Sequence, residues 1–126
     1  MKHKILSTKN APQAIGPYSQ AVIHNNILYC SGQIGLDPES MVVVEGGVEA
    51  ETRQVMKNLE QLLLEAGTSF SNVLKCSIYL DDMNNFTAVN EIYGSFFDDN
   101  PPARETVAVK TLPKNVKVEI SCIAYL

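Results

Sequence analysis

The sequence predicts an α+β fold in which two helices cover one face of a single mixed sheet of five to six strands. The first observation behind this prediction is the order of patterns along the chain, which runs strands, helix, strand, helix, strands. The second is the last strand-like run, where apolar side chains occupy every second position and so define one buried face.

The N-terminal part of the chain contains short strands separated by turns. A strand is expected over about Lys4 to Ser7, and NAPQAIGPYS then forms a loop because prolines and a glycine interrupt it. QAVIHNNILYCSGQI is interpreted as two strands around a turn at Asn25 and Asn26, since asparagine tolerates a left-handed backbone. We interpret MVVVEGG as the extension of a strand.

Two helices are expected, with the strand SNVLKCSIYL between them. The first runs from about Val48 to Ala66, and Gly67 suits its C-terminal cap. Its apolar face is formed by Val55, Leu59, Leu62, Leu63 and Ala66. The second helix runs from about Asn85 to Phe97, and the prolines of DDNPP end it. Its apolar face is formed by Val89, Ile92, Tyr93 and Phe96.

Two strands, over Glu105 to Lys110 and Val116 to Tyr125, complete the expected sheet. The even-numbered side chains of the last strand are apolar and should meet the helices. The odd-numbered face carries Glu119 together with bulky apolar Ile123 and Tyr125. Because two helices cover only one face of such a sheet, we expect this mixed face to contact another subunit, and a small site to lie between subunits.

Composition sets the class of protein. We expect residues 1–126 to form a single domain, with a hydrophobic content of 45% and a charged content of 19% that are usual for globular proteins. A net charge of −4 and a pI near 5.1 argue against nucleic acid as the main partner. No run is apolar enough for a membrane span or a secretory signal, so we expect a cytoplasmic protein, with an organelle such as the mitochondrion left open.

The cysteines and histidines give no sign of a metal or disulfide site. Cys30, Cys76 and Cys122 lie in apolar runs, where small buried thiols in a reducing compartment are expected. His3 and His24 are far apart and lack the spacing of metal ligands, so no metal site is expected.

Arg104 and Glu119 are the leading candidates for chemistry. Arg104 follows two prolines that restrict the backbone, and its guanidinium could bind a carboxylate through two donors; a solvated surface arginine is the simpler alternative. Glu119 stands in the middle of a long strand, where glutamate is depleted. It is either a partner in a cross-strand ion pair or a general base with a raised pKa.

Several polar residues form a second group of candidates, each with a structural alternative. Ser31 and Gly32 lie at the end of a strand, where glycine permits either a tight turn or bulge or the close approach of a ligand. Tyr18 is a ligand-facing hydroxyl or a packed loop aromatic, and Asn90 is an exposed helix residue or a site contact. Strand alternation places Arg104, Thr106 and Ala108 opposite Val107 and Val109, and therefore away from the expected core.

Five motifs then resemble one family. IGPYSQAV, YCSGQIG, VNEIY, PPARETVAV and LPKNVKVEISCIA follow one another across the whole chain as they do in the RidA family, also called the YjgF family. The resemblance implies a chorismate-mutase-like fold and a homotrimer with clefts between subunits. It implies hydrolysis of short-lived enamines and imines, such as 2-aminoacrylate, to 2-keto acids and ammonia. No metal or organic cofactor is implied.

The resemblance also implies roles for individual residues. Arg104 matches the arginine that holds the substrate carboxylate, and Glu119 matches the glutamate that positions or activates water. The positions that match the lining of the cleft are Tyr18, Ser31, Gly32 and Asn90. Thr106 stands where many bacterial members have cysteine, which puts a thiol role at this position in doubt, although its backbone can still contact a carboxylate.

The resemblance implies that the protein is a 2-iminobutanoate/2-iminopropanoate deaminase. A module that binds 2-keto acids without catalysis is one alternative, but binding alone needs Arg104 and not Glu119. An endoribonuclease or translation inhibitor is another, and the acidic composition counts against it. The expected partners are small 2-imino and 2-keto acids and further copies of the chain, with no membrane.

Overall fold

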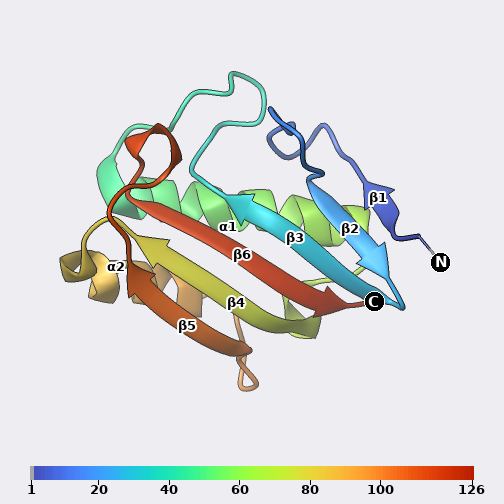
Figure 1. The fold of residues 1–126 in the computed structure, drawn as a ribbon. Coiled ribbons are helices and arrows are strands. Elements are labelled where there is room, and N and C mark those ends of the chain that lie inside the picture. The colour runs from blue at the N-terminus through green and yellow to red at the C-terminus, as the bar shows by residue number, and fades with distance from the viewer. Residues whose placement is uncertain (1) are drawn as a thin grey trace.

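The structure is a computed structural model that describes residues 2–126. These residues form six strands and two α-helices, together with short 3-10 turns (Figure 1). The strands are β1 (Lys4–Leu6), β2 (Ala21–His24), β3 (Ile27–Gln33), β4 (Val73–Leu80), β5 (Ala103–Ala108) and β6 (Val118–Tyr125). The helices are α1 (Gly47–Glu65) and α2 (Phe86–Gly94).

The six strands form one mixed sheet in the order β1-β2-β3-β6-β4-β5. All neighbouring pairs are antiparallel except β4 and β5, which run parallel because α2 connects them as a crossover (Figure 1). The hairpin between β2 and β3 turns at Asn25 and Asn26, whose φ angles of 51° and 63° confirm the left-handed turn predicted from these residues. The predicted class, a mixed sheet with two helices, is confirmed.

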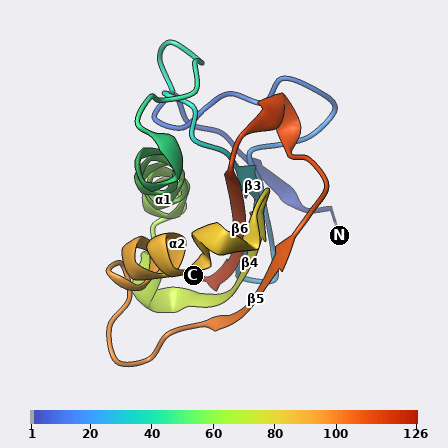
Figure 2. The same cartoon turned by 90° about the vertical axis from the view of Figure 1, so that its left-hand side faces the viewer.

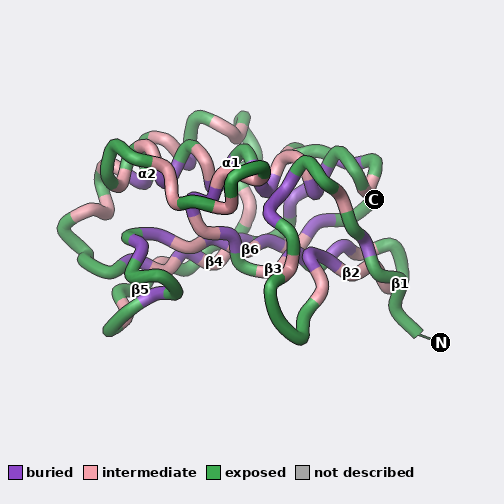
Figure 3. The backbone as a smooth tube through the Cα atoms, turned by 90° about the horizontal axis from the view of Figure 1, so that it is seen from above, coloured by how far each residue is buried: buried purple, intermediate pink, exposed green. Residues whose placement is uncertain are grey.

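Both helices lie on the same side of the sheet (Figure 2). The side chains between the helices and the sheet are buried, as the purple segments facing the two helices show (Figure 3). The predicted inward face of β6 is correct, since Val118, Ile120, Cys122 and Ala124 are all buried against this layer. The opposite face, here called the open face, has no helix over it and exposes large apolar side chains that include Tyr29, Val107 and Tyr125.

The boundaries of two predicted segments need correction. The second helix is shorter than expected, because a 3-10 turn (Met83–Asn85) precedes α2 and the α-helix stops at Gly94, a poor helix former. MVVVEGG does not extend a strand: its one ladder contact is an isolated bridge from Val43 to Leu36, and Met41 has a φ of 60° that breaks the extended path. Gly67, with a φ of 82°, ends α1 as predicted.

The helices of residues 2–126 were also compared with the requirements of a membrane span. None of them combines the length and the apolar character that crossing a bilayer demands.

Candidate functional site

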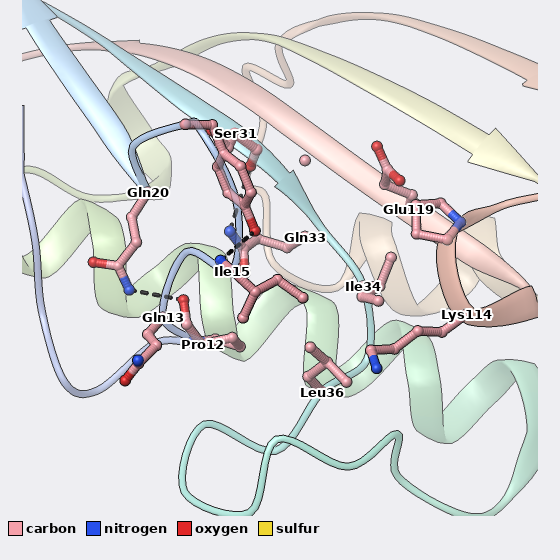
Figure 4. A pocket seen from close by; sticks show the side chains of 13 residues that line it. Pro12, Gln13, Ile15, Gln20, Ser31, Gln33, Ile34, Leu36, Lys114 and Glu119 are labelled. Carbon is pink, nitrogen blue, oxygen red and sulfur yellow. Dashed lines mark hydrogen bonds between the residues drawn. The ribbon is translucent and has the colours of Figure 1, made fainter.

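A pocket of about 430 Å³ lies where β3 ends and β6 begins, closed on one side by the loop that precedes β2 (Figure 4). Four of the predicted site residues line it: Tyr18, Ser31, Gly32 and Glu119. Its apolar walls come from Pro12, Ile15, Ile34 and Leu36. The pocket therefore combines one carboxylate and hydroxyl groups with an apolar lining, as small-molecule sites do.

Glu119 supplies the carboxylate of the pocket. It lies on the open face of β6, paired with Tyr79 of β4, and is half-buried. Burial raises the pKa of its carboxyl group above the usual range, because the charged form loses solvation. Among the described residues its carboxylate has no hydrogen-bond or ion-pair partner within the chain, which leaves it available to a ligand or water. The alternative role of Glu119, as a partner in a cross-strand ion pair, is not seen within residues 2–126, where Lys75 pairs with Glu105 instead.

Gly32 makes room for this carboxylate. The ladder between β3 and β6 shifts register between Cys30 and Gln33, which is the irregularity expected of a β-bulge. A Cβ atom added at Gly32 would lie 2.9 Å from the carboxyl carbon of Glu119 and closer still to its Oε2 atom. The register shift supports the bulge interpretation of Gly32, and the group that approaches this glycine closely within the chain is the Glu119 side chain.

The loop carrying Tyr18 is fixed by a buried amide. The Gln20 side chain donates from Nε2 to the carbonyl oxygens of Thr8, Ala11 and Pro12, the last at 2.8 Å (Figure 4). Its Oε1 atom accepts from the Thr8 backbone N–H at 2.7 Å. Ser31 closes the other side, with Oγ donating to the Ser19 carbonyl at 2.6 Å. Tyr18 itself stays 51% exposed at the mouth, where its hydroxyl oxygen faces the Ile15 N–H at 3.4 Å.

Arg104 lies elsewhere. It pairs with Cys76 of β4, and its side chain turns toward α2, where Nη1 donates to Oδ1 of Asn90. The centre of the guanidinium lies 5.5 Å from the ring centroid of Phe86 and 5.3 Å from that of Tyr93. Asn90 is thus a contact of Arg104 and does not line the Glu119 pocket.

The expectation that Arg104, Thr106 and Ala108 face away from the core is wrong. Their β4 partners are Cys76, Ile78 and Leu80, all buried under the helices, so the three residues lie on the helix-covered face. Alternation along β5 correctly separated the two faces but did not say which one the helices cover. The error arose because Val107, chosen as the core-facing residue, is 42% exposed on the open face.

Thr106 and Glu105 lie on opposite sides of β5. Thr106 Oγ1 is buried and finds no hydrogen-bond partner within residues 2–126. Glu105 lies on the open face, where it accepts from Ser77 and pairs with Lys75 at 3.2 Å, and these two hydrogen bonds lower the pKa of its carboxyl group. Glu105 therefore does not oppose an anion held by Arg104.

The sulfur atoms beside Arg104 are not reactive groups. Cys30, Cys122 and Cys76 form a row across three neighbouring strands and are free and buried, as predicted. Burial raises the pKa of the Cys76 thiol to about 12, so it stays protonated near neutral pH. No group of three or more His, Cys, Asp or Glu side chains within residues 2–126 is arranged to hold a metal ion.

The predicted site residues thus form two separate groups in one chain. Glu119 and its neighbours lie on the open face of β6, whereas Arg104 and Asn90 lie on the helix side of β5, with β4 between the two strands. A single small substrate cannot contact both groups within one chain, because the sheet separates them.

Gln20 and Lys114 are two polar residues of the pocket that sequence reasoning missed. Gln20 is one of the few buried polar side chains, and no pattern around it distinguishes it from a surface glutamine at the start of a strand. Lys114 also lines the pocket, from a left-handed position with a φ of 57° after Pro113. A non-glycine residue at positive φ gives no signal in the sequence that would single it out.

Comparison with known proteins identifies the family. The family model described as endoribonuclease L-PSP matches residues 8–126. The human 2-iminobutanoate/2-iminopropanoate deaminase is 48% identical over 121 residues, which cover 96% of this chain and 88% of the human protein. The crystal structure of a Rid-family protein of unknown function from Yersinia pestis superposes with a TM-score of 0.96 at 47% identity, covering 99% of this chain and 100% of that one.

A third relative is informative because it was solved with a ligand. TdcF of Escherichia coli, crystallised with bound serine, superposes with a TM-score of 0.92 at 36% identity over 98% of each chain. The two solved structures share the fold described above almost from end to end. The family model and the sequence relatives point to the same family as the motifs. The chain belongs to the RidA family.

Proposed function

We propose that this protein is a deaminase that hydrolyses 2-imino acids, such as 2-iminobutanoate and 2-iminopropanoate, to 2-keto acids and ammonia. The observation that carries the proposal is the Glu119 carboxylate, which faces the pocket half-buried and without a partner among residues 2–126. Its pKa is raised above the usual range. The identity to the human deaminase supports the reaction class. The pocket side chains can position a planar imine and a water molecule, and positioning supplies much of the catalysis of a reaction that is already fast in water.

The proposed reaction has three steps. The Arg104 guanidinium binds the substrate carboxylate through its remaining N–H donors. Glu119 accepts a proton from a water molecule as the water oxygen attacks the imine carbon, which gives a carbinolamine. Glu119 passes this proton to the nitrogen, which completes the carbinolamine. The hydroxyl proton of the carbinolamine then moves through Glu119 to the same nitrogen as the carbon–nitrogen bond breaks, so that ammonia leaves and the carbonyl forms. An enamine such as 2-aminoacrylate enters after a proton is added at its terminal carbon, which converts it to the imine.

We infer that the working form is a homotrimer in which Arg104 of one copy approaches the Glu119 pocket of the next. Two features support this arrangement. Arg104 and Glu119 lie on opposite sides of the sheet, so joining them on one substrate needs two copies. The open face also exposes Tyr29 and Tyr125, each 43% exposed, and Val107, which would be covered by a neighbouring copy. Sedimentation of the purified protein tests the assembly, and a monomer at working concentration would contradict it.

Trapping of the imine tests the reaction. An amino-acid oxidase generates the 2-imino acid, and semicarbazide captures what survives; the protein should suppress formation of the semicarbazone. Glu119→Gln keeps the shape of the side chain but removes the base, so we expect suppression to be lost. Arg104→Ala should also lose it. If Arg104→Ala suppresses semicarbazone formation as well as the wild-type protein does, the assignment of the carboxylate site is contradicted. If the wild-type protein does not suppress it, the deaminase function is contradicted.

A second candidate is a binding module for small carboxylates without catalysis, favoured by the serine bound to TdcF. Calorimetric titration with 2-oxobutanoate separates the two functions. Binding with no imine hydrolysis would support the module, whereas hydrolysis that depends on Glu119 would exclude it. A third candidate, the endoribonuclease named by the family model, predicts RNA cleavage by the same preparation. For the deaminase we propose the cytoplasm, in keeping with three free buried thiols.

A further inference from the structure

We propose that one face of α2, here called the arginine platform and formed by Phe86, Asn90 and Tyr93, fixes the direction of the Arg104 guanidinium. In this proposal Asn90 is a positioning residue that acts through Arg104. The proposal rests on the proposed function in one respect, namely that the Arg104 guanidinium binds the substrate carboxylate. The geometry of the platform stands without that assumption.

The contacts surround the guanidinium on several sides. Asn90 accepts a hydrogen bond from Nη1, while the rings of Phe86 and Tyr93 lie 5.5 and 5.3 Å from the guanidinium centre. Such distances are typical of a cation over an aromatic face. An arginine on an exposed edge strand otherwise samples many rotamers, and these contacts select one of them.

The spacing of the platform residues shows that one helical face is devoted to this contact. Phe86, Asn90 and Tyr93 are four and three residues apart, so they lie above one another along α2. Asp82 accepts from the Asn84 N–H and caps the 3-10 turn that leads into α2. At the other end, Tyr93 is buried, with 5% of its surface exposed, and its ring packs against that of Phe97 with 4.9 Å between the centroids. The platform is therefore anchored by the core while Arg104 lies over its outer edge.

The chemistry of the acceptor supports a role toward an anion. The hydrogen-bond partner is an amide, which orients the guanidinium without neutralising its charge. The nearest acidic neighbour in sequence, Glu105, is turned to the other face and is already paired with Lys75. Within residues 2–126 Arg104 makes no ion pair. With five donors and one hydrogen bond to Asn90, the guanidinium keeps its positive charge and its remaining donors for a carboxylate.

Nuclear magnetic resonance of the guanidinium tests this proposal independently of catalysis. The chain has two arginines, Arg53 and Arg104, so Arg53→Lys leaves a single guanidinium signal and serves as the reference protein. Asn90 and the two aromatic rings hold the Arg104 guanidinium, so rotation about its Cζ–Nη bonds should be slow. Asn90→Ala should increase the rotation rate on the order of tenfold, and Phe86→Leu should increase it less. Unchanged rotation in Asn90→Ala would overturn the proposal.

Kinetics supply the second readout, with Asn90→Asp as the matched variant. Asn90→Ala should raise KM on the order of tenfold with a smaller effect on kcat, since a misdirected guanidinium binds the carboxylate less well. Asn90→Asp keeps the acceptor and the slow rotation but neutralises the cation, so it should raise KM at least as much. A merely structural asparagine predicts the opposite, namely that Asn90→Asp rescues Asn90→Ala.

A double-mutant cycle completes the test. If Asn90 acts through Arg104, adding Asn90→Ala to Arg104→Ala should cause no further loss of activity or of 2-oxobutanoate binding. Additive losses would overturn the proposal. If the wild-type protein shows no deaminase activity, the proposed function fails, but the rotation rates of Asn90→Ala and Asn90→Asp still decide whether the platform orients Arg104.

Discussion

At the scale of single residues, the clearest relation is between Gly32 and Glu119. The Glu119 carboxylate occupies the space into which any side chain at position 32 would project. The obstacle is the far end of a flexible side chain, so a larger residue would move the carboxylate and leave the backbone in place. Position 32 therefore controls where the proposed base lies, although it contributes no functional group.

Gly32→Ala should reduce kcat/KM on the order of tenfold to a hundredfold, because the carboxylate must leave its position over the bulge. The melting temperature should change little. Gly94→Ala is the matched control, since a Cβ atom there meets no atom within 4 Å. Steady-state kinetics and thermal melts of both variants check this, and full activity in Gly32→Ala would contradict the assigned position of the base.

The raised pKa of Glu119 predicts a pH-dependent stability difference. The folded state binds the Glu119 proton more tightly than the unfolded state, so its contribution to stability is present below the unfolded pKa and is lost as the pH rises through the raised folded value. Glu119→Gln has no such loss. We therefore expect Glu119→Gln to gain stability relative to wild type between pH 4 and pH 7.5, measured by thermal melts.

Glu105→Gln is the control of opposite sign. Hydrogen bonds from Ser77 and Lys75 lower the pKa of Glu105, so its contribution to stability is present above the unfolded pKa and is lost as the pH falls through the folded value. Glu105→Gln should lose stability relative to wild type over the same rise in pH. A difference between Glu119→Gln and wild type that does not change with pH would contradict the burial of this carboxylate.

At the scale of elements, the loop from Thr8 to Gln20 is held by one side chain. Gln20 satisfies three buried or half-buried carbonyl groups and one N–H group, so its removal leaves several backbone groups without partners. Gln20→Ala should lower the free energy of unfolding by about 1–3 kcal/mol. It should also raise KM by releasing Tyr18. Asn10→Ala, at an exposed position of the same loop that does not line the pocket, should change neither quantity in urea titrations and kinetics, and equal effects of the two variants would contradict the role of Gln20.

The strands differ in how far their faces could be predicted. In β6 every second residue is apolar and the strand lies in the middle of the sheet, so the contrast between faces is strong and the prediction was correct. β5 is an edge strand only partly covered by α2, and most of its residues are exposed. Val107 was assigned to the core for its apolar character, whereas Arg104 belongs to the covered side because the long side chain reaches the aromatic rings of α2.

At the scale of the whole molecule, the sequence pointed to candidate site residues but did not show that they form two separate groups within one chain. Tyr18, Ser31, Gly32 and Glu119 come together because β3 and β6 are neighbours, and a long alternating strand beside a hairpin made this foreseeable. The distance from Arg104 to Glu119 depends on the order of β4, β5 and β6 in the sheet. That order is set by long-range packing, which residue patterns along the chain do not encode.

This separation makes a prediction about mixed assemblies. Arg104→Ala and Glu119→Gln should each be inactive alone, because every site lacks one group. When the two variants are refolded together at equal concentration, a site built between copies receives an intact Arg104 with a probability of one half and an intact Glu119 with a probability of one half. The mixture should therefore recover about one quarter of wild-type activity in the semicarbazide assay. Mixing the two without refolding is the control, and a refolded mixture that stays inactive would place both groups of each working site in the same chain.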